Sequence, residues 1–149
     1  AALDDPQGQE VFESVLSQQE ERIIILSVQD TALVNALQSK AAVVLQKSTR
    51  EGFGLTVTEA MWKGTPVIGG KVGGIPYQIQ NGGNGFLVSS PEEAADRLIK
   101  LLKDEKLRQD MGLKGKESVR QKFLMTRLME EYLDLFGSFE ICFKLTKRV

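Results

Sequence analysis

The sequence predicts an α/β fold in which a parallel β-sheet is flanked by helices. Short apolar runs rich in Val and Ile alternate along the chain with longer segments in which apolar residues recur at helical spacing. Residues that favour turns and helix starts separate the two kinds of segment. Strands that alternate with helices are joined by right-handed crossovers, so the sheet is expected to be parallel and covered on both faces.

The strands of this sheet are predicted from four segments, residues 22–28, 41–46, 65–70 and 86–88. The segment at 22–28, RIIILSV, is a continuous apolar run, which is typical of a strand buried on both faces. Doubly wound domains usually carry about five or six strands. We therefore expect a further strand and helix upstream of Ala1.

Helices are expected between and after the strands. They are predicted at residues 8–19, from Asp30 or Thr31 onward, from about Leu55 to Gly64, from Ser90 onward, at 105–123 and at 126–136. Ser90, Pro91 and Glu93 form a capping box at the start of their helix. Residues 1–137 are predicted to form one domain. Residues 138–149 are predicted to form a C-terminal tail, whose alternating apolar residues fit either a strand or a loosely held extension.

The composition narrows the chemistry. The 149 residues carry a formal net charge of -1, and without a basic excess nucleic acid is not an expected partner. No apolar run approaches the length of a membrane span, so no membrane is expected either. There is one cysteine, Cys142, and no histidine, which excludes an internal disulfide, a Cys/His metal cluster and a His-based catalytic triad. A reducing, cytoplasmic location and no metal are the resulting expectations.

The stretch EGFGLTVTE, from Glu51 to Glu59, has the features of an anion site. It leaves the strand at 41–46 at its carboxyl end, where open α/β sheets bind ligands. Gly52 and Gly54 let the backbone approach a ligand closely. The helix that starts near Leu55 turns its free N–H groups toward that space, and a phosphate or diphosphate is the natural guest.

The two carboxylates that flank this stretch would repel a phosphate but can accept hydrogen bonds from sugar hydroxyls. From Leu55 to Glu59 the helix rises by about 6 Å. Glu51 could therefore hold a sugar at one end of a diphosphate, and Glu59 a ribose at the other, as in a nucleotide-activated sugar. Alternatively, Glu59 is a solvated helix residue and Glu51 belongs to a turn.

A second glycine cluster, GGKVGG at residues 69–74, follows the strand at 65–70. Its spacing fits neither a phosphate-binding Walker loop nor a dinucleotide fingerprint. It is either a tight exit from the strand or a second backbone wall near the transferred sugar.

The order of these features resembles a known family. The two glutamates with the glycine pair between them, followed by AMWKGTPVIGGKVGGI, resemble the E-x7-E signature of retaining, nucleotide-sugar-dependent glycosyltransferases of the GT-B fold. The match is good over residues 22–87. Within that family, LQKSTREGFGLTVTEAMWKGTPVIGG and GGIPYQI are similar to archaeal-type trehalose synthases, which transfer glucose from a nucleotide donor to glucose. Many relatives have Pro-Glu after Gly-Gly-Ile, and Tyr77 and Gln78 depart from that form.

The resemblance implies roles for individual residues. Glu51 would be the catalytic residue, holding hydroxyls of the donor sugar and stabilising charge near its anomeric centre. The backbone amides of Phe53, Gly54 and Leu55 would bind the diphosphate or the sugar. Glu59 would hold the ribose hydroxyls.

Three further positions complete the donor site that the resemblance implies. Val28 falls where the family binds the base, and Gly73 and Gly74 would lie near the sugar pocket. The donor would be UDP-, ADP- or GDP-glucose, with no further cofactor, and the hexose would be transferred with retention of configuration.

The resemblance also implies what this chain lacks. The Arg and Lys that neutralise the diphosphate in the family would lie on a strand before Ala1, and an N-terminal domain would bind the sugar acceptor. The chain would thus be the C-terminal, Rossmann-like half of a GT-B hexosyltransferase and inactive alone. Apolar residues at 133–143 would then be exposed, so a homo-oligomer is a possible consequence.

Two other functions fit the residues. A truncated Rossmann-like domain could be a non-catalytic interaction module that associates with another chain. An epimerase-like enzyme of the same architecture also binds nucleotide sugars, but the lack of histidine for acid–base chemistry and the E-x7-E loop disfavour it.

Overall fold

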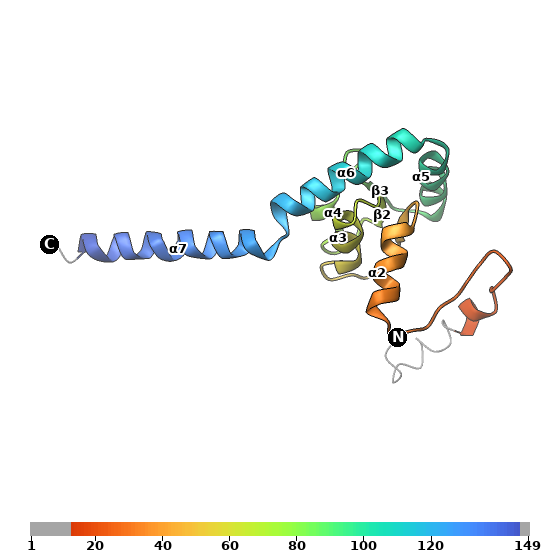
Figure 1. Ribbon diagram of the computed structural model, residues 1–149, viewed down its shortest axis with the longest axis horizontal. Coiled ribbons are helices and arrows are strands. Elements are labelled where there is room, and N and C mark those ends of the chain that lie inside the picture. The colour runs from red at the N-terminus through yellow and green to blue at the C-terminus, as the bar shows by residue number, and fades with distance from the viewer. Residues whose placement is uncertain (1–12, 147–149) are drawn as a thin grey trace. The chain divides into compact units, whose positions relative to one another are not determined.

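The computed structural model describes residues 13–146, with side chains to residue 138. The chain divides into two compact units, Ala1–Thr31 and Ala32–Val149. The elements, which Figure 1 labels except for β1, are α2 (Thr31–Lys40), β1 (Val44–Gln46), α3 (Leu55–Trp62), β2 (Val67–Gly70), α4 (Ile75–Gln78), β3 (Phe86–Val88), α5 (Pro91–Lys103), α6 (Glu105–Lys122) and α7 (Met125–Thr146).

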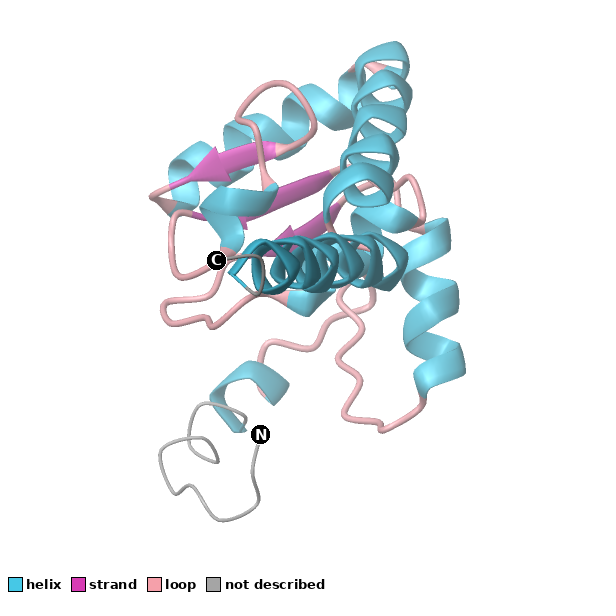
Figure 2. Cartoon of the chain, turned by 90° about the vertical axis from the view of Figure 1, so that its left-hand side faces the viewer, coloured by secondary structure: helices cyan, strands magenta, loops and turns pink. Residues whose placement is uncertain are grey.

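The sheet of the second unit is parallel, as the alternation of strands and helices predicts. Its strands lie in the order β1-β2-β3, with Val44 opposite Val67 and Ile68 opposite Phe86. Figure 2 shows the three strands side by side with helices around them. All three carboxyl ends therefore meet at one edge of the sheet, and the loops that follow β1 and β2 lie there together.

Helices cover both faces of this sheet. On one face Val67 packs in a buried cluster with Met61 of α3, Ile75 of α4 and Val119 of α6. On the other face Ile68 packs with residues of β3, with Leu101 of α5 and with Met111 of α6. Neighbouring strand residues point to opposite faces, so Val67 and Ile68 pack β2 against the helices on the two faces of the sheet.

The predicted strand at residues 22–28 is wrong. Ile23 forms a single antiparallel bridge with Glu20, and residues 24–30 have no regular structure. The side chain of Ile24 is exposed, and Val28 is 51% exposed, so the run is not buried on both faces. A strand is stable only when neighbouring strands satisfy its backbone groups, and among residues 13–31 of the first unit this run pairs with Glu20 alone. The sheet consequently has three strands and not four.

The other element predictions hold, with adjusted ends. Helices α2, α3, α5 and α6 lie where helices are expected, and residues 13–16 of the first predicted helix are helical, whereas its residues 8–12 lie outside the described part. The segment after Phe136 differs from both expectations. It is neither strand nor extension, because α7 runs without a break through Gly137 to Thr146.

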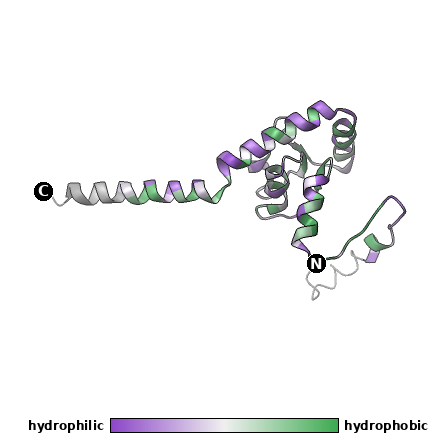
Figure 3. Cartoon of the chain, in the orientation of Figure 1, coloured by the Kyte–Doolittle hydropathy of each residue, from purple (hydrophilic) through white to green (hydrophobic). Residues whose placement is uncertain are grey.

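The exposed side chains of α7 include a large apolar set. They are Met125, Leu128, Met129, Tyr132, Leu133, Leu135 and Phe136. Figure 3 shows green, hydrophobic bands that alternate with polar ones along the described part of this helix. Within the described residues, no helix combines the length and the apolar character that a membrane crossing requires.

The predicted capping box of α5 is present in a shifted form. Ser90 Oγ accepts a hydrogen bond from the Glu93 N–H (3.2 Å), and Glu93 Oε2 accepts from the N–H of Ser89 (2.6 Å), one residue before the cap. That bond from Ser89 is the main cause that lowers the pKa of Glu93. The backbone of the residue before the cap thus contributes to the start of α5.

Replacing Ser90 with alanine removes the acceptor of the Glu93 N–H. We expect the free energy of unfolding to fall by about 1 kcal/mol, measured by urea denaturation. Ser89→Ala is the control, because Ser89 takes part through its backbone alone. Equal losses in the two variants would show that the Ser90 hydroxyl does not cap α5.

Candidate functional site

The loop between β1 and α3 ends in a glycine that shapes the start of the helix. Gly54 is the N-cap of α3 and has left-handed backbone angles, φ 85° and ψ 57°. A Cβ at this position would lie 3.0 Å from Cγ1 of Ile75. No side chain caps α3. Its first N–H groups are therefore left to whatever approaches from outside the helix.

The second glycine cluster packs directly against this loop. The N–H of Gly74 donates to the carbonyl oxygen of Gly52 at 2.6 Å. A Cβ on Gly73 would lie 1.9 Å from the carbonyl oxygen of Glu51, and one on Gly74 2.9 Å from that of Gly52. Side chains cannot fit at either position, so residues 71–74 form a backbone wall that supports the loop.

Contacts with this wall orient the peptide groups of the loop. The carbonyl of Gly52 accepts from Gly74, and the carbonyl of Phe53 accepts from Nε2 of Gln78, which is 2% exposed. In a trans peptide the N–H points opposite to the C=O, and the described residues contain no cis peptide. The N–H groups of Phe53 and Gly54 therefore point away from the wall.

Four consecutive N–H groups are thereby left unpaired at the mouth of α3. Those of Phe53, Gly54, Leu55 and Thr56 have no hydrogen-bond acceptor anywhere in the part of the chain that the structure describes. The positive end of the helix dipole lies at the same place. Clustered free amides at a helix N-terminus bind anions such as phosphate.

Glu51 is held beside this mouth by protein donors. Its Oε2 accepts from Gln46 Nε2 (3.2 Å) and Ser48 Oγ (3.3 Å), and its Oε1 accepts from the N–H of Gly52 (3.0 Å). Gln46 is the last residue of β1, so the strand end fixes the carboxylate. A carboxylate has about four acceptor positions. These three bonds leave Glu51 able to accept one from a ligand.

Glu59 lies in the second turn of α3 and is exposed. Its Oε2 accepts a hydrogen bond from Nε2 of Gln38 in α2 at 3.0 Å. Its Oε1 has no partner among residues 13–138. The second carboxylate thus keeps one oxygen free for a ligand.

Most of the predicted site residues come together in the structure. Glu51, Gly52, Phe53, Gly54 and Leu55 form one loop and helix start, and Gly73 and Gly74 pack against it. The Phe53 ring packs edge-on against Phe123 at 5.7 Å between centroids. Val28 belongs to the first unit, whereas this loop belongs to the second. Its role remains a prediction.

Sequence reasoning missed two glutamines that support the site. In the sequence, Gln78 stands out only as a departure from a pattern common in the family. In the structure its Nε2 donates to the Phe53 carbonyl and fixes it. Its Oε1 is buried and has no partner among the described residues. Its spacing from the buried Ile75 places it on the inner face of α4, which was the available signal. Gln38, which holds Glu59, gave no such signal.

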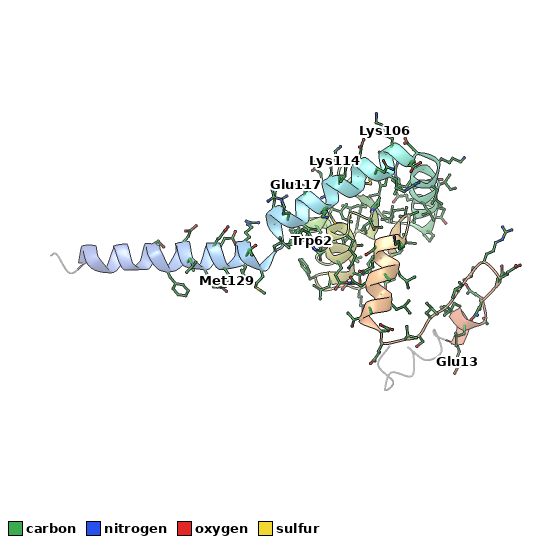
Figure 4. The ribbon with its side chains drawn as sticks, in the orientation of Figure 1. Glu13, Trp62, Lys106, Lys114, Glu117 and Met129 are labelled. Atoms are coloured by element: carbon green, nitrogen blue, oxygen red, sulfur yellow. The ribbon has the colours of Figure 1, made fainter. Side chains whose placement is uncertain are left out.

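Trp62, at the end of α3, lies outside the site. Lys116 of α6 places its Nζ over the Trp62 ring at 5.6 Å from the centroid, and Figure 4 shows Trp62 beside α6. Met61 is fully buried in the core. Both residues have the packing role that their helical position predicts.

A parallel α/β domain with an amide-lined helix mouth at a strand end, and with a carboxylate on each side, defines a class of domains that bind phosphorylated ligands. The chain belongs to the family of glycosyl transferases group 1, whose model matches residues 14–118. It has the fold of the C-terminal domain of a GT-B glycosyltransferase.

Comparison with individual proteins agrees with this assignment. The chain is 47% identical to the trehalose synthase of Pyrococcus horikoshii over 142 residues, which cover 92% of this chain and 34% of that enzyme. The structure is similar to the C-terminal domain of the group 1 family protein LpcC from Francisella tularensis, with a TM-score of 0.68, 30% identity and coverage of 81% and 65% of the two chains.

A third relative was solved with a nucleotide. Anabaena Alr3699/HepE in complex with UDP matches with a TM-score of 0.77 and 25% identity, covering 88% of this chain and 38% of that one. The chain spans about a third of the length of the trehalose synthase it matches.

Proposed function

We propose that this chain is the donor-binding domain of a retaining hexosyltransferase that takes glucose from a nucleotide-diphosphate sugar and passes it to a sugar acceptor, as in trehalose synthesis. The observation that carries the proposal is the row of four unpaired N–H groups from Phe53 to Thr56, set between Glu51 and Glu59. The amides provide donors for a diphosphate, and the carboxylates provide acceptors for hydroxyls on either side of it.

In this proposal the diphosphate docks on the mouth of α3. The amides of Phe53, Gly54 and Leu55 and the helix dipole stabilise its negative charge, which also grows on the leaving diphosphate as the glycosidic bond breaks. Glu51 accepts from a hydroxyl of the donor sugar and stabilises positive charge that develops at the anomeric carbon. Its bonds to Gln46 and Ser48 keep it in place without reorganisation during the reaction.

The other parts of the donor are assigned by position. Glu59 accepts hydrogen bonds from the ribose, Val28 contributes to the base site, and Gly73 and Gly74 border the sugar. The UDP complex of Alr3699/HepE supports UDP as the first nucleotide to test, and ADP and GDP complete the set.

The acceptor is proposed to bind to residues that relatives carry outside the matched third of their length. The cationic groups that neutralise the diphosphate are placed there too. We therefore expect no glucosyl transfer by these 149 residues alone. This expectation is checked by an assay for trehalose with each of the three nucleotide-glucose donors.

Donor binding is tested by titrating the chain with UDP in a calorimeter. Replacing Glu59 with alanine is expected to weaken UDP binding by about tenfold or more, since a charge-assisted hydrogen bond contributes on the order of 1.5–3 kcal/mol. Glu130→Ala is the control, because Glu130 is another exposed helical glutamate, on α7. Equal affinities of the Glu59 and Glu130 variants would contradict the ribose assignment.

Weak binding by the chain itself has a direct check. The region that precedes the match in the Pyrococcus horikoshii enzyme is fused to Ala1, and the titration is repeated. Failure of the fusion to bind UDP, ADP or GDP would overturn the proposed function, because the missing cations could no longer explain the result.

The alternative of a non-catalytic module is supported by one observation, the exposed apolar side chains of α7. It implies association with another chain, or with a second copy, that does not depend on nucleotide. Sedimentation equilibrium with and without UDP separates the two functions.

A further inference from the structure

Gln38 is a buried residue of α2, and its side chain contacts two charged groups, Glu59 of α3 and Lys63 at the C-cap of α3. Its Nε2 donates to Glu59 Oε2 at 3.0 Å, and its Oε1 accepts from Nζ of Lys63 at 2.6 Å. One amide orientation satisfies both contacts, because an ammonium only donates and a carboxylate only accepts. The carbonyl of Gln38 also accepts from Oγ1 of Thr65 at 2.6 Å. The glutamine is therefore fixed at its backbone and at its side chain.

Without the Gln38 side chain, Glu59 and Lys63 would be expected to form an ion pair with each other. Glu59 lies in α3 and Lys63 is the C-cap residue four positions later, and a glutamate four residues before a lysine is the order that most favours an ion pair along a helix. Ion pairs between described residues include Glu105–Arg108, Glu117–Arg120 and Glu131–Arg127. Lys63 donates instead to Gln38 and to the backbone oxygen of Glu59 (3.4 Å).

We infer that Gln38 is a positioning residue for ribonucleotide recognition. Its side-chain oxygen accepts a hydrogen bond from the Lys63 ammonium, and its side-chain nitrogen donates to one oxygen of Glu59. The other oxygen of Glu59 stays available to the two hydroxyls of a ribose. Glu59 then discriminates ribonucleotides from nucleotides that lack these hydroxyls. The inference rests on the proposed function, because it assigns a ribose to Glu59.

The test compares binding of UDP with binding of 2′,3′-dideoxy-UDP, in the chain or in the fusion described above. The wild type is expected to prefer UDP by about tenfold or more, and Glu59→Ala to lose the preference. Gln38→Ala is expected to lose most of it, because Lys63 then pairs with the freed carboxylate. Lys63→Met is expected to keep it, and the double variant Gln38→Ala/Lys63→Met to regain part of it.

Two further measurements separate positioning from loss of structure. Gln109→Ala is the matched control, since Gln109 Nε2 also donates to a glutamate, Glu105, on α6 (3.1 Å), and it is expected to change nothing. A crystal structure of Gln38→Ala without ligand is expected to show Lys63 Nζ at ion-pairing distance from the Glu59 carboxylate. This second result does not require nucleotide binding.

The outcomes are distinguishable. A preference for UDP that depends on Glu59 but survives in Gln38→Ala would overturn the inference and leave the proposed function standing. A Gln38→Ala crystal structure in which Lys63 stays apart from Glu59 would overturn it as well, as would a double variant that regains nothing. Absence of nucleotide binding in the fusion would overturn the proposed function, and the ribose assignment with it.

Discussion

Replacing Gly112 with alanine is expected to lower the free energy of unfolding by about 3 kcal/mol. A Cβ at this position of α6 would lie 2.0 Å from the carbonyl oxygen of Gly64 and 3.0 Å from its carbonyl carbon. That carbonyl cannot turn aside easily, because the N–H of Thr65 in the same peptide group donates to the carbonyl oxygen of Ala60 (3.0 Å). The clash would push α6 away from the end of α3.

The size of the effect follows from two opposed terms. Alanine favours a helix interior over glycine by about 1 kcal/mol, which offsets part of the clash. The contact between α3 and α6 also buries Met61 and Val119, so that opening it exposes core surface. Overpacking therefore dominates, and the variant is destabilised in spite of its better helix propensity.

Trp62 is the probe for this experiment, because it is the single tryptophan and contacts Lys116 of α6. Urea denaturation followed by its fluorescence gives the unfolding free energy. Gly137→Ala is the control, since a Cβ there meets nothing within 4 Å and the residue is also helical. The control is expected to match or exceed the wild type. A Gly112 variant as stable as the Gly137 variant would show that α6 does not pack on Gly64 as described.

Local pattern was sufficient to predict the three strands of the second unit and helices α2, α3, α5 and α6. The runs around Val67 and Phe86 lie between glycine turns and helices with clear caps, and neighbouring strands pair with them. The loop from Glu51 to Gly54 was predictable because glycine spacing at the junction of a strand and a helix has few other uses. Parallel topology and a glycine-shaped helix start at a strand end follow from these residues without tertiary information.

Tertiary context decided what the sequence could not predict. Residues 22–28 have the composition of a buried strand, but whether a strand forms depends on the pairing and packing partners around it, which composition does not reveal. The alternation at residues 139–145 suggested an extended segment, yet the helix that begins at Met125 continues through it. Gln38 and Gln78 act through partners at least 20 positions away along the chain, Glu59 and Phe53. No local sequence pattern predicts hydrogen bonds between residues so far apart along the chain.

Replacing Gly73 with alanine is expected to damage the candidate site more than any change to its side chains. Gly73 has a φ of 53°, and a Cβ would lie 1.9 Å from the carbonyl oxygen of Glu51 and 2.7 Å from that of Gly52. Relief requires the two glycine loops to separate, which breaks the bond from Gly74 to Gly52. The peptide that carries the Phe53 N–H would then lose its orientation.

The expected consequence is a loss of UDP affinity on the order of 100-fold. Two amide donors to the diphosphate would be misplaced, and each charge-assisted hydrogen bond contributes at least about 1.5 kcal/mol. The unfolding free energy is expected to fall as well, by about 3 kcal/mol. Titration with UDP and urea denaturation on the same sample measure both effects.

Gly82→Ala separates the clash from the strain of a left-handed alanine. Gly82 has a φ of 79°, but a Cβ there meets nothing within 4 Å. This control is expected to cost about 1–2 kcal/mol of stability and to leave UDP affinity unchanged. If the Gly73 variant matched it in stability and in UDP affinity, the wall at residues 71–74 would not orient the amides of the loop. The binding site would then have to lie elsewhere.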